Sequence, residues 1–132
     1  MIFEIWYYKA TLPNSGGIKG RPILIIGDDG ENNLSIVDIH YCLISSSSPK
    51  GKFDVEISDP VAKSLGLSQA SVIKTTKVYT GSKGLLERKV CDLPKDLRDE
   101  FIAKYKEYQS GIMSALDENN PPEDPPPPSP ST

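Results

Sequence analysis

Short apolar runs separated by polar turns fill most of the chain, and a helical pattern follows them. Alternating or β-branched apolar residues are typical of strands, whereas apolar residues recurring every three or four positions are typical of a helix. The segment 85–90 is short, and its pattern is ambiguous. The pattern predicts strands over five ranges: 3–9, 22–27, 34–45, 53–57 and 71–80.

Two helices are predicted. Asp59 followed by Pro60 is typical of an N-cap with proline at the first helical position, and Gly66 suits a C-cap, so a short helix should end at Leu65. A longer helix should run from 94 to about 116. Its apolar face would comprise Leu97, Phe101, Ile102, Tyr105, Tyr108, Ile112, Met113 and Leu116.

The strand after Arg21 is apolar at every position from Ile23 to Ile26, which indicates burial on both faces. Because proline lacks an N–H, we expect Pro22 to be the first residue of this strand. Arg21 would then sit at a rigid edge, where a guanidinium can bind phosphate in a bidentate manner. On these residues alone, an ordinary surface arginine beside a turn is the simpler interpretation.

The strand 34–45 alternates. Val37, Ile39, Tyr41 and Leu43 should share one face. His40, the one histidine of the chain, falls on the other face, and a partly exposed structural histidine is the simpler interpretation. No two-histidine acid–base pair can therefore form.

These elements predict a mainly β (α+β) fold, a small and strongly bent antiparallel sheet with a short inserted helix and a C-terminal α-helix. Closure toward a barrel would remove exposed sheet edges. Residues 1–116 would form the one folded domain. Residues 117–132 hold no apolar side chain except proline, so we expect an acidic, proline-rich disordered tail.

Charge and cysteine content narrow the function. The chain carries −3, and residues 117–132 hold four acidic and no basic residues, which leaves +1 for residues 1–116. This is not the profile of an obligate nucleic-acid binder, so we expect no DNA binding by the chain itself. A small site that contacts a few phosphates is still compatible with this charge.

Cys42 and Cys91 have no metal-ligand spacing, and no metal or cofactor is expected. The N-terminus has no signal-peptide pattern and no run is long enough to span a membrane, so we expect a cytoplasmic protein.

The remaining polar residues suit a reaction that needs few protein groups. RNA carries its own nucleophile, the 2′-hydroxyl, and an enzyme can act by bending the backbone in line and stabilising charge on phosphorus. Arg21, hydroxyls from the run Ser45 to Ser48 and lysines of the strand 71–80 could supply this. A solvated serine loop and an exposed strand face are the simpler alternatives.

The order of these residues resembles the PemK/MazF family of toxin endoribonucleases. The matching segments are Glu4-Ile5-Trp6, the run Gly20-Arg21-Pro22-Ile23-Leu24-Ile25-Ile26, Leu43-Ile44-Ser45-Ser46, the strand 71–80 and Leu86 to Leu93. The resemblance covers residues 3 to about 116. It implies an SH3-like barrel, a homodimer and a cognate antitoxin, and cleavage of single-stranded RNA without metal that leaves a cyclic phosphate.

Carried over by position, the resemblance makes Arg21 the catalytic, phosphate-contacting arginine, and Ser45 or Ser46 the catalytic hydroxyl. We expect RNA contacts from Lys19, Lys50, Lys74, Thr76 and Lys77. The chain departs from the family in the strand 71–80, where Lys74 and Thr76 occupy positions at which some members carry arginine and aspartate. Lysine keeps the charge but lacks the bidentate fork, and threonine cannot act as a carboxylate base.

Two alternatives follow from these departures and from the fold. The chain could be a catalytically weakened relative that binds RNA or a protein. It could also inhibit a protein target, as the gyrase poison CcdB does through its C-terminal residues. The polar tail of this chain argues against the second alternative.

Overall fold

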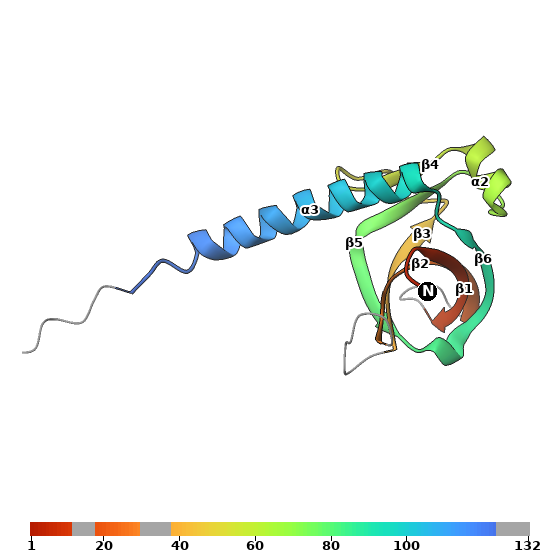
Figure 1. The fold of residues 1–132 in the computed structure, drawn as a ribbon, viewed down its shortest axis with the longest axis horizontal. Helices are drawn as coiled ribbons and strands as arrows, with labels where there is room; N and C mark the ends of the chain where they lie inside the picture. Colours follow the sequence, from red (N-terminus) through yellow and green to blue (C-terminus); the bar gives the residue numbers. More distant parts are fainter. Residues whose placement is uncertain (12–17, 30–37, 124–132) are drawn as a thin grey trace, which may run out of the picture.

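The computed structural model describes residues 1–11, 18–29 and 38–123. Within them lies a six-stranded antiparallel sheet in the order β4-β5-β3-β2-β1-β6. The sheet curls into a half-barrel, and one long helix projects away from it (Figure 1). The expected fold class is therefore confirmed. None of the helices in these ranges is both long and apolar enough to cross a membrane.

The strands agree with the predicted ones in order and differ at their ends. The bounds are β1 Glu4–Thr11, β2 Ile18–Asp28, β3 Ile39–Ser45, β4 Val55–Ile57, β5 Ser71–Gly81 and β6 Leu86–Asp92. The ambiguous segment thus forms a strand, which pairs with β1. A 3-10 turn at Lys83–Leu85 precedes it. Residues 34–37 of the predicted third strand lie outside the described part of the chain.

The position of Pro22 corrects one prediction. The strand β2 begins at Ile18, and Pro22 lies inside it, opposite Tyr7 of β1. Pairing with β3 starts only at Ile23, which faces Leu43. At Pro22 the strand therefore has a neighbour on one side only, and a residue without an N–H is tolerated there.

The helices need two smaller corrections. The helix α2 spans Asp59–Leu65, and its N-cap is Ser58, so Asp59 occupies the first helical position. The Asp59 carboxylate pairs with the ammonium group of Lys63, one turn later, at 2.9 Å. A negative charge in the first turn also interacts favourably with the helix dipole. Gly66 closes the helix with φ of 95°, as predicted. The helix α3 spans Lys95–Glu118, two residues beyond the expected end.

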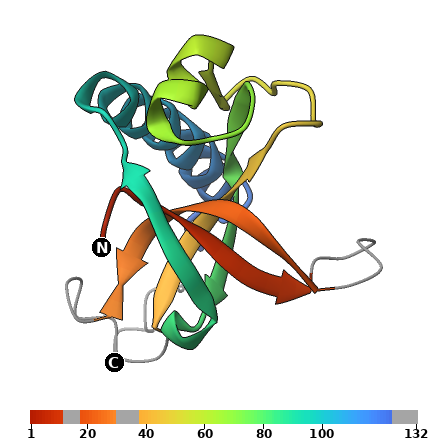
Figure 2. The same ribbon diagram turned by 90° about the vertical axis from the view of Figure 1, so that its right-hand side faces the viewer.

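Two apolar clusters lie on the two faces of the curled sheet. Ile5, Leu24 and Ile44 belong to the cluster that α2 and the first turns of α3 cover, whereas Ile23 and Ile25 belong to the other. The strand β2 is thus buried on both faces, as its sequence predicts. Figure 2 shows α2 and α3 together on one side of the sheet.

The face assignment for the third strand is confirmed where it can be followed. Ile39 and Tyr41 are buried in the second cluster, and Leu43 packs against it. The remaining alternate positions, Cys42 and Ile44, are buried in the first cluster, so this strand also has two apolar faces.

Candidate functional site

A cavity of ≈ 330 Å³ lies where the start of β2, the end of β3 and the segment after α2 meet. Polar side chains from all three, and from β1 and β5, line it: Tyr7, Arg21, Ser46, Ser68 and Ser71. Pro22, Ile44 and Leu67 supply its apolar lining. The cavity therefore combines one cation, several hydroxyls and an apolar surface, which suits a phosphate ester attached to a ring.

Arg21 is held by the β1–β2 ladder, in which it faces Tyr8. Its side chain is exposed, and within the described residues it forms no ion pair. A fixed backbone with an uncommitted guanidinium is what anion binding requires.

Within the serine run, Ser45 has a structural role and Ser46 has a hydroxyl that faces the cavity. The Ser45 hydroxyl accepts the N–H groups of Ser47 and Ser48 at 3.3 and 3.1 Å and bonds to the Ser48 hydroxyl at 3.0 Å. Ser45 thus shapes the turn. Ser46 is exposed and lines the cavity together with Arg21. The structure brings together Arg21 and Ser46, and it does not place Ser45 on the cavity wall.

Lys74 has a structural partner. Its Nζ donates to Asp54 Oδ2 at 2.8 Å and to the carbonyl oxygen of Pro49 at 3.2 Å. The same carboxylate oxygen accepts the N–H of Gly51 at 2.7 Å. Because Asp54 is buried, its charge needs these donors, and Lys74 is occupied in holding the loop before β4.

The other expected RNA-contacting residues lie away from the cavity wall. Lys50 and Lys77 are exposed, and Thr76 is half-buried on β5. The strand β5 is irregular here, because Cys42 faces Val78 while Ile44 faces Ile73, so that residues 74–77 form a bulge. The side chain of Lys19 lies outside the described part of the structure.

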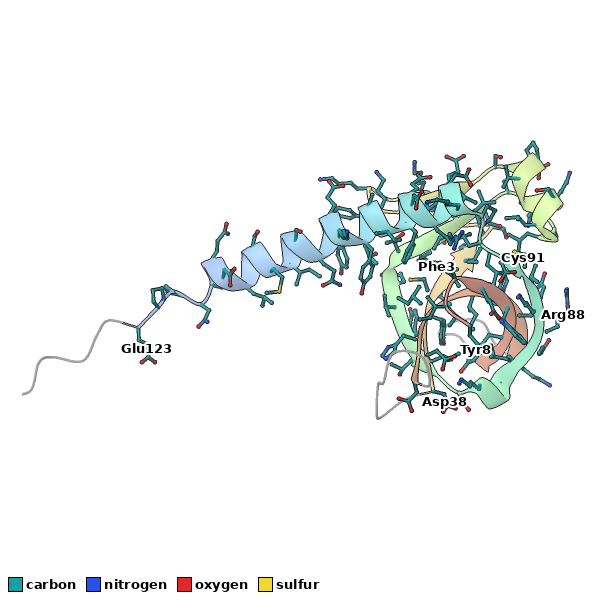
Figure 3. The ribbon with its side chains drawn as sticks, viewed as in Figure 1. Phe3, Tyr8, Asp38, Arg88, Cys91 and Glu123 are labelled. Atoms are coloured by element: carbon teal, nitrogen blue, oxygen red, sulfur yellow. The ribbon has the colours of Figure 1, made fainter. Side chains whose placement is uncertain are left out.

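Sequence reasoning missed the contribution of β6. Arg88 lies over the ring of Tyr7, with its Cζ 4.3 Å from the ring centroid. Figure 3 shows Arg88 on the outer side of β6, whereas Tyr8 lies inside the curled sheet. The Glu87 carboxylate lies next to Gly20, since a Cβ built on that glycine would approach Glu87 Oε2 to 3.1 Å. The β1–β6 pairing that creates these contacts leaves no local signal in the sequence.

The two thiols differ from activated nucleophiles. Burial, followed by the nearby charge of Asp54, raises the pKa of the Cys42 thiol to about 12. Burial also raises the pKa of the Cys91 thiol. Both groups stay protonated at neutral pH. His40 is half-buried on β3 and packs against Gly27.

Comparison with known proteins identifies a matching family and structures of similar fold. Residues 2–107 match the family described as PemK-like, MazF-like toxin of type II toxin–antitoxin system. The fold is similar to that of the Mycobacterium tuberculosis toxin MazF-mt6, with 17% identity, a TM-score of 0.63 and coverage of 81% of this chain and 96% of that one. It is also similar to MazF in the MazE-MazF complex (Form-III) from Deinococcus radiodurans, with 21% identity, a TM-score of 0.59 and coverage of 83% and 94%.

A third similar structure is an endoribonuclease in complex with its cognate antitoxin from Mycobacterial species, with 12% identity, a TM-score of 0.58 and coverage of 83% and 94%. No curated protein matches the sequence. The structures establish the likeness of the fold, and the family match spans well over half of the sequence. The chain therefore belongs to the PemK-like, MazF-like toxin family of type II toxin–antitoxin systems.

Proposed function

We propose that this chain is an endoribonuclease toxin that cuts single-stranded RNA without a metal ion, by attack of a ribose 2′-hydroxyl on the adjacent phosphate. The observation that carries the proposal is the meeting of Arg21 and Ser46 on one cavity of ≈ 330 Å³. A cavity of this size accommodates a nucleotide-sized group.

In this reaction the 2′-oxygen forms a bond to phosphorus and the bond from phosphorus to the 5′-oxygen breaks. The 2′-hydroxyl loses a proton, the departing 5′-oxygen gains one, and the other fragment keeps a 2′,3′-cyclic phosphate. Negative charge grows on the non-bridging oxygens in the transition state. Arg21 would neutralise it through two N–H donors, and the Ser46 hydroxyl would donate a third hydrogen bond.

The proton acceptor in this proposal is Glu87. Its carboxylate lies beside Gly20, the residue before Arg21, and its side chain is exposed. A carboxylate next to the bound phosphate can take the proton of the 2′-hydroxyl. The assignment supplies the base that Thr76 cannot provide.

Flanking phosphates would be held by Arg88, Lys50 and Lys77. Arg88 is oriented by the face of Tyr7, which reduces the entropy lost when its guanidinium binds an anion. Lys74 is left out, because its ammonium group is bonded to Asp54. Arg88 would thus supply the strong cation that the strand β5 lacks.

Regulation is proposed to follow the pattern of the similar proteins. Two of the similar structures hold a toxin together with its antitoxin. We therefore assign to this chain a cognate antitoxin protein as partner. The family resemblance adds a homodimeric state to the proposal, and the sequence pattern adds a cytoplasmic location.

The test is incubation of the purified protein with a single-stranded RNA in EDTA, with mass spectrometry of the new ends. The expected products carry 2′,3′-cyclic phosphate and 5′-hydroxyl ends, and Arg21→Ala abolishes them. Binding of the RNA without any such product would support the second candidate, a weakened relative that only binds. The ion pair between Lys74 and Asp54 is the observation that favours this candidate, because it leaves Lys74 unavailable for RNA.

A further inference from the structure

The cavity that holds Arg21 and Ser46 has a second wall that the proposed chemistry does not use. The segment between α2 and β5 supplies this wall through Leu67, Ser68 and Ser71. Phosphate binding accounts for one end of the cavity, and an RNA chain carries a base beside each phosphate. The second wall is therefore the part of the cavity that a base would meet.

Three neighbouring strands, β2, β3 and β5, reach the cavity at one end of the sheet. The β3–β5 ladder pairs Ser45 with Val72, and one further step of this antiparallel register brings Ser46 level with Ser71. Ser71 is thus one strand farther from Arg21 than Ser46 is. Neighbouring strands lie about 4.8 Å apart, so roughly 10 Å separates β2 from β5 across this end of the sheet. This is the scale of one nucleotide, from its phosphate to the far edge of its base.

The segment between α2 and β5 is anchored at both ends. The Leu67 N–H donates to the Ala62 carbonyl oxygen at 2.9 Å, and the Leu67 side chain is buried in the first apolar cluster. The Ala70 N–H donates to Asp59 Oδ1 at 3.2 Å, which ties the other end to the start of α2. A wall that is held at two points keeps its side chains in place before a ligand arrives, and this reduces the entropy lost on binding.

Ser71 presents a hydrogen-bond acceptor at this wall. Its hydroxyl donates to the Gln69 carbonyl oxygen at 3.0 Å, so its only proton is already used. The oxygen keeps its lone pairs, and water has little access to it because Ser71 is only 6% exposed. A buried acceptor of this kind gains from an N–H donor, whereas a second acceptor placed against it remains unpaired.

Apolar side chains flank this acceptor. Ile44 and Leu67, both buried, reach the cavity from β3 and from the segment after α2, and Pro22 lines it from β2. An apolar surface favours the face of a flat ring, whereas the Ser71 oxygen favours a donor at the edge of that ring. The wall therefore offers separate contacts for the two parts of a nucleobase.

We infer that Ser71 selects the base next to the phosphate bound by Arg21, and that the selected base carries an exocyclic amino group. Adenine and cytosine have an amino donor at the edge position where guanine and uracil have a carbonyl oxygen. The amino group donates to Ser71 Oγ, whereas a carbonyl oxygen would face another acceptor with water excluded. Ser46 and Ser71 thus have different roles, one at the phosphate and the other at the base. The inference rests on the proposed function, to which it adds the class of base.

Binding of RNA analogues that cannot be cut tests the inference without relying on cleavage. The probes are hexamers of adenosine, cytidine, uridine and inosine with 2′-fluoro groups in place of the attacking hydroxyls. In a fluorescence titration, at least one of the two amino hexamers should bind the full chain about tenfold more tightly than both keto hexamers, as expected of one specific base contact. The matching hexamer whose base lacks the amino group, purine for adenine or pyrimidin-2-one for cytosine, should bind like the keto hexamers. Binding as tight as that of the amino hexamer would overturn the inference.

Variants assign the preference to Ser71. Ser71→Ala should reduce it to less than about threefold, while Ser64→Ala should leave it unchanged. Ser64 is an exposed residue of α2 outside the cavity, and its hydroxyl also donates to a carbonyl oxygen, that of Val61, at 2.6 Å. Circular dichroism checks the fold of both variants. A wild type that binds all four hexamers alike or prefers the keto hexamers, or a preference that survives in Ser71→Ala, would overturn the inference.

The inference and the proposed function fail separately. Amino-selective binding without cleavage of unmodified RNA would refute the nuclease activity and leave the inference standing. Cleavage that depends on Arg21, together with no preference for amino hexamers, would refute the inference and leave the nuclease activity standing. Failure of the wild type to bind any of the hexamers or to cut RNA would refute both.

Discussion

The ammonium group of Lys74 lies 2.8 Å from Asp54 Oδ2, and this pair joins β5 to the loop before β4. Asp54 is 2% exposed, so its carboxylate depends on donors from the protein. The lysine that the family resemblance assigns to RNA is thereby used for the fold. In the proposed mechanism, the positive charge at the phosphates is supplied instead by Arg21 on β2 and Arg88 on β6.

Replacing Lys74 should therefore act on stability. Lys74→Met leaves a buried carboxylate without its cation and should lower the free energy of unfolding by about 2 kcal/mol, as measured by urea denaturation. Lys77→Met, at an exposed position of the same strand, should change it by less than about 0.5 kcal/mol. Equal stability of the two variants would refute the structural role of Lys74.

The two serines should separate function from folding. Ser46→Ala should lower the rate of RNA cleavage by about tenfold at unchanged stability, because it removes a donor to the phosphate. Ser45→Ala removes the acceptor of two N–H groups and should cost about 1 kcal/mol of unfolding free energy, with a smaller effect on cleavage. The reverse pattern would identify Ser45 as the catalytic hydroxyl.

The contact between Arg88 and Tyr7 should contribute measurably to the affinity for RNA. Tyr7→Leu removes the ring that orients Arg88 and should weaken binding about threefold, which corresponds to a cation–π contribution of about 0.5–1 kcal/mol. Tyr7→Phe keeps the ring and serves as the matched control. If both variants bind like the wild type in a fluorescence titration, the Tyr7 ring does not position Arg88 for RNA.

Glu87→Gln tests the proton acceptor. The amide preserves size and cannot accept the proton, so the cleavage rate should fall by about a hundredfold. The measurement is the single-turnover cleavage rate of both proteins under the same conditions. A variant that cleaves RNA at the wild-type rate would exclude Glu87 as the base.

Alkaline pH should destabilise the fold in a defined range. Burial raises the pKa of the Cys42 thiol from 9.0 to about 12, and burial with the charges of Tyr8 and Tyr79 raises the pKa of Tyr41 from 10.0 to about 12. The unfolded chain loses these protons first, so the folded state binds more protons between pH 9 and 12. The free energy of unfolding should therefore decrease as the pH rises through that range.

Cys42→Ala should reduce that decrease, since one of the two groups is removed. Urea denaturation at successive pH values from 8 upward measures it. An unchanged slope in the variant would show that Cys42 ionises no later in the folded protein than in the unfolded one.

The sequence was sufficient for the features that depend on local pattern. The apolar run at Ile23 to Ile26, the glycine that ends α2 and the periodicity of α3 predicted those elements correctly. The cavity was predictable only in part, because Arg21 and Ser46 are 25 positions apart and meet through strand pairing. Glu87 and Arg88 were missed because β6 pairs with β1, which lies 78 to 88 positions earlier in the sequence.

The prediction for Pro22 failed for a reason beyond local pattern. Pro22 lies within a strand because one side of β2 is unpaired there, which depends on where β3 ends. The apolar stripe of α3 was expected from its spacing, and the barrel covers only the first part of it. Helical periodicity predicts that a face is apolar, but it does not reveal which surface covers that face.

The central claim is that Arg21 neutralises the phosphate during RNA cleavage. The most direct measurement is the single-turnover cleavage rate of a single-stranded RNA in EDTA for the wild type and Arg21→Ala, with Lys95→Ala, at an exposed position in the first turn of α3, as the cationic control. We predict a loss of at least about a hundredfold for Arg21→Ala, a change of less than about threefold for the control, and unchanged stability of both. Equal rates for the wild type and Arg21→Ala would contradict the account.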